Sequence, residues 1–118
     1  MTTEELKAFR QDTLDDVISA NFASVKARAG YAEVDAFDGE ITELMSSAVM
    51  DMLTAGVPAD MFEDDPIDAR IINAMAMYVL AYIEQDRSDT NRYLTLYKRL
   101  TFKLSLEDGG AWDVESDD

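Results

Sequence analysis

Apolar residues recur along most of the chain at helical spacing, and no alternating strand pattern is evident. Three segments show a one-sided stripe, and a fourth, from Pro66 to about Gln85, is apolar on nearly every side after Arg70. The three stripes consist of Leu14, Val17, Ile18, Phe22 and Val25; of Phe37, Ile41, Leu44, Met45, Ala48, Val49 and Met52; and of Tyr93, Tyr97, Leu100 and Leu104. The pattern predicts an all-α bundle of four main helices, with the fourth segment at its centre.

The first two main helices have recognisable ends. Thr13 and Asp16 stand in capping-box spacing, and Gly30 predicts the end of a helix that runs from Thr13 to about Ala29. We expect Asp35 to cap the second helix, which ends at Gly56 and Pro58.

The last two helices begin at different signals. Asp65-Pro66 offers an N-cap followed by a proline at the first helical position, which predicts the start of the central helix. The polar run 88–90 predicts the start of a last helix that ends near Leu106.

Residues 1–106 are expected to form a single domain that includes a short extra helix within residues 1–12, where Thr2 and Glu5 stand in capping-box spacing. Residues 107–118 predict a flexible acidic tail with a Gly-Gly pair. The tail carries Trp112, which either folds back on its own domain or docks in a pocket of a partner.

Composition removes several kinds of chemistry. The chain has 118 residues, 47% of them hydrophobic, and it contains neither cysteine nor histidine. Thiol catalysis, imidazole metal sites and histidine bases are therefore excluded, and no nucleophile–base pair or glycine-rich phosphate loop stands out. We expect no enzyme activity, no catalytic site and no cofactor.

Two acidic motifs invite a metal interpretation. Aligning Gly39 with the glycine of an EF-hand loop places Val34, Ala36 and Met45 at ligand positions, so the oxygen ligands are missing. The acids between residues 60 and 68 complement the start of a helix without any metal. The sequence therefore predicts no metal site.

Two polar features of the helices favour packing over a ligand site. Asn73 stands among apolar neighbours, so we expect it to bond to a backbone group or another helix. Four tyrosines at helical spacing are expected to pack in the core with their hydroxyls at its rim: Tyr78, Tyr82, Tyr93 and Tyr97.

The amino terminus lacks the basic start and apolar run of a signal peptide, which predicts synthesis and retention in a cytosol-like compartment. The longest near-continuous apolar run, 71–83, is too short to cross a bilayer, so no membrane association is expected.

The chain has a net charge of −15, and its acidic and basic residues are concentrated in different segments. Residues 31–68 carry 11 acids and no base, residues 69–106 carry 3 acids and 6 bases, and residues 107–118 carry 6 acids. Such asymmetry can orient copies of a protein against one another. The alternative is a set of unrelated solvated faces.

Two blocks of residues resemble the head-tail connector family of long-tailed bacteriophages, whose members are also called DNA packaging proteins or adaptors. The first block is Phe37-Asp38-Gly39-Glu40-Ile41, Leu44, Ala48, Asp51-Met52 and Ala55-Gly56-Val57. The second is Asp65-Pro66-Ile67, Ala74, Tyr78-Val79, Arg92-Tyr93, Tyr97, Leu100 and Ser105-Leu106. The likeness covers about residues 13–106, in the order and spacing of that family's helices.

The resemblance implies a structural virion protein, made in the host cytoplasm, at the interface of head and tail. It implies a ring of about twelve copies below the portal protein, which continues the DNA channel for genome retention and ejection and receives the next tail-side neck protein, a stopper or tail terminator. Genomic DNA would pass through the lumen without specific binding.

A closed ring needs two different complementary patches on each copy. Glu40, Glu43 and Asp51 fall on one flank of the second main helix, and Arg92, Arg99 and Lys103 fall together on the last one. We expect these two groups to meet between subunits, where charge sets the register and apolar contacts supply affinity.

Two other functional hypotheses remain open. The first is an acidic DNA mimic that occupies the basic cleft of a nuclease or repressor, and the second is a helical adaptor. A mimic predicts a monomer or dimer with acids over one long face, whereas a connector predicts acids split between two ends of the chain and a self-associating basic stripe.

Overall fold

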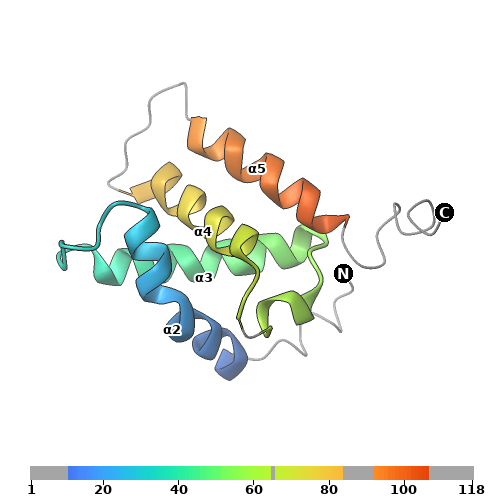
Figure 1. Cartoon of the computed structure of the whole chain (residues 1–118), viewed down its shortest axis with the longest axis horizontal. Helices are drawn as coiled ribbons and strands as arrows, with labels where there is room; N and C mark the ends of the chain where they lie inside the picture. Colours follow the sequence, from blue (N-terminus) through green and yellow to red (C-terminus); the bar gives the residue numbers. More distant parts are fainter. Residues whose placement is uncertain (1–10, 65, 84–91, 107–118) are drawn as a thin grey trace.

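The structure, a computed structural model, describes residues 11–64, 66–83 and 92–106 of the chain (Figure 1). The predicted N-terminal helix, the start of the last helix at 88–90 and the tail with Trp112 lie outside these ranges.

The described residues form helices only, which confirms the predicted all-α class. The elements in chain order are α2 (Gln11–Arg28), α3 (Asp38–Ala55), the short 3-10 helix η1 (Ala59–Phe62), α4 (Ala69–Tyr82) and α5 (Arg92–Ser105). The four α-helices coincide with the four main helices that the apolar spacing predicts, within a few residues at each end.

Helix α4 lies at the centre of the bundle, in contact with α2, α3 and α5 (Figure 1). Its buried side chains point in several directions, since α4 is enclosed by helices rather than laid on a surface: Ile71, Ile72, Ala74, Met75, Ala76, Val79 and Ala81. Helices α2 and α5 cover different sides of α4, and α3 contacts all three. The near-continuous apolar segment therefore occupies the position predicted for it.

Glycines end α2 and α3 as predicted. Gly30 and Gly56 have φ of 87° and 111°, in the left-handed region that favours glycine. After α3, Gly56 N–H donates to Leu53 O at 3.1 Å and Val57 N–H donates to Met52 O at 3.0 Å. Both bonds satisfy carbonyls that the end of the helix would otherwise leave open.

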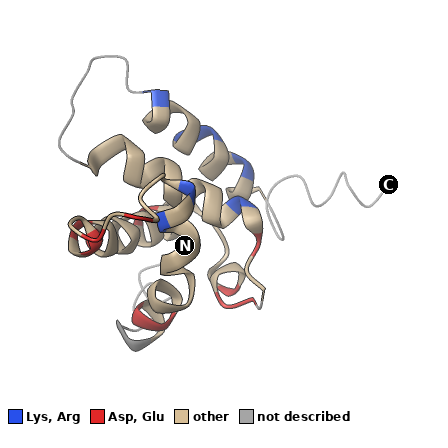
Figure 2. Ribbon diagram, turned by 60° about the vertical axis from the view of Figure 1, so that its left-hand side comes forward, with Lys and Arg blue, Asp and Glu red and all other residues tan. Residues whose placement is uncertain are grey.

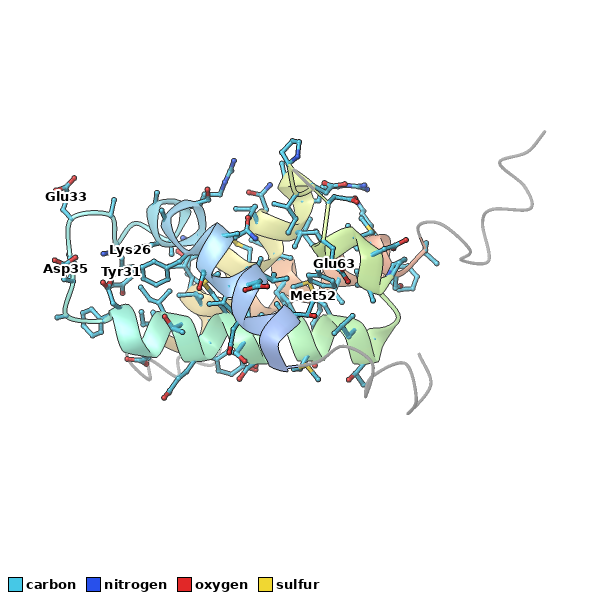
Figure 3. All side chains as sticks on the ribbon, turned by 90° about the horizontal axis from the view of Figure 1, so that it is seen from below. Lys26, Tyr31, Glu33, Asp35, Met52 and Glu63 are labelled. Atoms are coloured by element: carbon cyan, nitrogen blue, oxygen red, sulfur yellow. The ribbon has the colours of Figure 1, made fainter. Side chains whose placement is uncertain are left out.

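The prediction that Asp35 caps α3 is wrong. Phe37 precedes the helix, and no side chain caps it. Asp35 instead accepts a hydrogen bond from Lys26 Nζ at 2.9 Å, and Asp38 Oδ1 lies 2.9 Å from the same ammonium (Figure 3). A nearly buried cation on α2 attracts both carboxylates, and this tertiary pairing fixes the connection between α2 and α3.

This pairing shifts the ionisation of both partners. The hydrogen bond to Asp35, followed by that to Asp38, raises the pKa of Lys26, and the hydrogen bond from Lys26 lowers the pKa of Asp35. The Lys26 side chain is only 10% exposed, so its stem packs within the fold while its ammonium meets the two acids.

The predicted start of α4 at Asp65-Pro66 is also wrong. The helix begins at Ala69, because Asp68 is its N-cap and accepts a hydrogen bond from Arg70 N–H at 2.8 Å. The Arg70 guanidinium holds the same carboxylate through Nε at 3.1 Å and Nη2 at 2.7 Å. Proline fixes only its own φ, whereas Asp68 supplies the acceptor that the first helical turn requires. The helix ends at Tyr82, before the predicted Gln85.

We expect Asp68→Ala to lower the free energy of unfolding by about 0.5–2 kcal/mol at neutral pH, because the cap is lost. Hydrogen bonds from the Arg70 side chain and backbone lower the pKa of Asp68 below its ordinary value of 3.8. The stabilisation is therefore complete above that ordinary value and is lost as the pH falls through the lowered value in the folded protein.

Urea denaturation at several pH values measures the free energy of unfolding of the wild type and of Asp68→Ala. The difference between the two proteins should become smaller below pH 3.8. The matched control is Asp64→Ala, which removes an exposed carboxylate just before the same helix. Equal losses in the two variants would contradict the capping role.

Candidate interaction surfaces

The outward side of α5 is basic and partly apolar. Within Arg92–Ser105 there is no acidic residue, and the opposite side of the helix buries Tyr97, Thr101 and Leu104. We call the outward side the α5 face; it consists of the exposed residues Arg92, Leu96, Lys98, Arg99, Phe102 and Lys103. Figure 2 shows its cations in blue along α5, whereas acids lie on α2, α3 and the segment around η1.

Sequence reasoning missed three residues of the α5 face: Lys98 and the two apolar residues Leu96 and Phe102. Leu96 is 40% exposed and Phe102 is 63% exposed. The signal was present, since both apolar residues stand on the polar side of the helical pattern, outside the stripe of Tyr93, Tyr97, Leu100 and Leu104. The predicted cations Arg92, Arg99 and Lys103 share this exposed side.

Of the predicted acidic flank of α3, Asp51 contacts α5 of the same chain. Asp51 and Glu43 are exposed and Glu40 is half-buried. The Tyr97 hydroxyl donates to Asp51 Oδ2 at 2.5 Å, so this carboxylate joins α3 to α5 within one subunit. The structure thus engages Asp51 internally and places it beside the helix that carries the α5 face.

Tyrosine rings fill the contact between α4 and α5. The Tyr78 ring centroid lies 4.8 Å from that of Tyr82 and 5.0 Å from that of Tyr97. Burial, followed by the hydrogen bond to Asp51, raises the pKa of Tyr97 far above its ordinary range. These rings pack against their neighbours, as predicted, and Tyr93 is half-buried at the start of α5.

Asn73 bonds to another helix, which confirms its predicted role. Its Oδ1 accepts a hydrogen bond from Arg28 Nη1 of α2 at 2.8 Å. The bond satisfies a polar group on the central helix and ties the end of α2 to it.

A groove of about 720 Å³ separates α2 from the residues that connect α3 to α4. Val17, Phe62 and Ile72 line it together with the acids Asp16 and Glu63. Nowhere in the described ranges do three or more Asp or Glu side chains gather closely enough to hold a metal ion. No described helix is long and apolar enough to cross a membrane.

We expect Tyr97→Phe to lower the free energy of unfolding by about 0.5–1.5 kcal/mol, because one hydrogen bond is lost while the exposed Asp51 carboxylate regains water. Denaturant unfolding of the wild type, both single variants and the Tyr97→Phe/Asp51→Ala double variant measures the coupling. Tyr97→Phe should lower the free energy of unfolding by less when Asp51 is already Ala than it does in the wild type. An equal loss in both cases would show that the hydrogen bond between Tyr97 and Asp51 contributes nothing to stability.

Comparison with known proteins assigns this arrangement to a family. Residues 11–111 match a family model described as phage connector protein, which spans all four α-helices and most of the chain. Searches of curated proteins and of solved structures find no match. The chain belongs to the phage connector protein family, the structural proteins that join head and tail in the virions of bacteriophages.

Proposed function

We propose that copies of this chain form a closed ring of about twelve subunits below the portal protein. The ring joins the head to the tail and receives the next neck protein on the tail side, a stopper or tail terminator. The observation that carries the proposal is the family match over residues 11–111. The α5 face supports it, since an exposed surface that combines four cations with Leu96 and Phe102 is suited to contact with another protein.

The ring continues the DNA channel, through which the genome is retained and ejected. Each copy carries a net charge of −15, so twelve copies surround the duplex with about 180 net negative charges. Acidic walls repel the phosphates, and DNA therefore moves through the lumen without specific binding.

Contacts within the ring are head-to-tail, so each subunit contributes two different patches. The α5 face is one of them, and its positive charge comes from Arg92, Lys98, Arg99 and Lys103, of which the sequence predicts all but Lys98. Exposed ion pairs contribute only about 0–1 kcal/mol each, so the apolar side chains of the face supply most of the affinity. On the acidic side, Glu40, Glu43 and Asp51 of α3 are the residues that the sequence predicts.

Imaging the portal vertex tests the ring. Purified protein is mixed with DNA-filled heads that carry the portal, and the vertices are compared with those of untreated heads by electron cryo-microscopy. We expect an added ring of density below the portal. Vertices that remain unchanged would contradict the proposal and would favour a protein that acts away from the neck, such as an acidic DNA mimic.

Charge reversal tests the α5 face in the same assay. We expect Arg99→Glu/Lys103→Glu to lower ring occupancy at the vertex, because acids would then face the acidic side of the neighbouring copy. The matched control is Arg99→Lys/Lys103→Arg, which keeps both charges and should assemble normally. Full ring occupancy with Arg99→Glu/Lys103→Glu would show that the α5 face does not take part in the subunit contact.

A further inference from the structure

We propose that the α5 face of one copy docks on the acidic loop of the next copy, where the acidic loop is the exposed segment Glu33-Val34-Asp35 between α2 and α3. The inference rests on the proposed ring and names the surface that the ring contact uses. It replaces the α3 flank as the acidic partner of the α5 face.

The three exposed large hydrophobic side chains of the described residues are divided between these two surfaces. Leu96 and Phe102 lie on the α5 face, and Val34, which is 39% exposed, lies at the centre of the acidic loop. Each surface therefore combines an uncovered apolar side chain with charge of a single sign. That combination is typical of a protein interface, in which apolar contact gives affinity and charge gives register.

The charges of the two surfaces are complementary. Four cations and no acid stand on the α5 face. Glu33 and Asp35 flank Val34, and residues 31–68 contain no base at all. A second copy of the chain therefore offers the α5 face a partner of opposite charge that also covers its apolar side chains.

Several contacts within the subunit hold the acidic loop. Lys26 anchors its end through Asp35 and Asp38, the Tyr31 and Phe37 rings meet edge to face at 5.4 Å, and Val34 N–H donates to Tyr31 O at 3.0 Å. Figure 3 shows Glu33 and Asp35 at the outer edge of the molecule, with Lys26 and Tyr31 behind them. A segment fixed in this way loses little conformational entropy when it docks.

The position of the acidic loop fits a head-to-tail contact better than the α3 flank does. The loop follows α2, and α2 and α5 lie on different sides of α4 (Figure 1). On the α3 flank, Asp51 is bound to Tyr97 of α5 in the same chain, so this member of the flank lies on the side of α5. Repeated contacts around an axis require patches on different sides of the subunit, and the acidic loop meets that requirement.

Crosslinking between single-cysteine variants tests the contact, because the chain has no cysteine of its own. Val34→Cys and Phe102→Cys replace exposed side chains, and one of the two variants carries a mass tag. The variants are mixed, assembled on DNA-filled heads that carry the portal, treated with a short bismaleimide and separated by mass. We expect at least about tenfold more mixed dimer than either like-with-like dimer, since a head-to-tail ring brings different patches together.

Two further mixtures with Phe102→Cys serve as controls. A crosslink to Glu43→Cys would show that the α5 face contacts the α3 flank, and a crosslink to Trp112→Cys would show that it contacts the acidic tail. Cryo-microscopy of the same heads shows whether a ring has formed. Rings in which Phe102→Cys links to either control position, or to none, would overturn the inference and leave the proposed ring intact. Heads that gain no ring with wild-type protein would overturn the inference together with the proposed function.

Discussion

Enclosure of one apolar helix is the constraint on which this structure depends. Ala74, Met75 and Ala76 are fully shielded from solvent although, as consecutive helix positions, they point to different sides of α4. Three other helices cover most of α4, and its partly exposed side carries Asn73, Met77 and Leu80. The places of α2, α3 and α5 follow from this enclosure, and each contributes one apolar stripe.

Polar contacts at the edge of this core join particular pairs of helices. Arg28 joins α2 to α4 through Asn73, Asp51 joins α3 to α5 through Tyr97, and Lys26 joins α2 to the start of α3. Each bond lies at the edge of the core, where one partner keeps contact with water. Their net contributions are small compared with apolar burial, but they fix how the helices are turned against one another.

The sequence predicted the helices well, because spacing at 3.6 residues per turn is a local signal that the core then uses directly. It predicted two helix starts incorrectly for a different reason. Asp35 is a residue type that often caps helices, but it bonds to Lys26, which is nine residues away. Asp65-Pro66 predicts a helix start, but the helix is capped instead by Asp68, which Arg70 holds in place. Caps depend on competition between nearby acceptors and on tertiary partners, and neither can be read from one position.

The surfaces were partly predictable. The cations Arg92, Arg99 and Lys103 and the place of Phe102 outside the apolar stripe are visible in the helical pattern, but only the assembled bundle shows that no other helix covers Phe102. The engagement of Asp51 by Tyr97 was hidden for the same reason, since it joins residues 46 positions apart. Spacing within a helix can group side chains, but it cannot say which neighbouring helix they will meet.

The turn at Gly56 has a mechanical consequence. A Cβ built on this glycine would stand 3.5 Å from Cβ of Ser105, so the final turn of α5 rests against the backbone that ends α3. Space is adequate there, and it is the φ of 111° that disfavours other residues. A force that pushes the end of α5 toward α3 would therefore be resisted by a short turn whose backbone hydrogen bonds hold it to the last residues of α3.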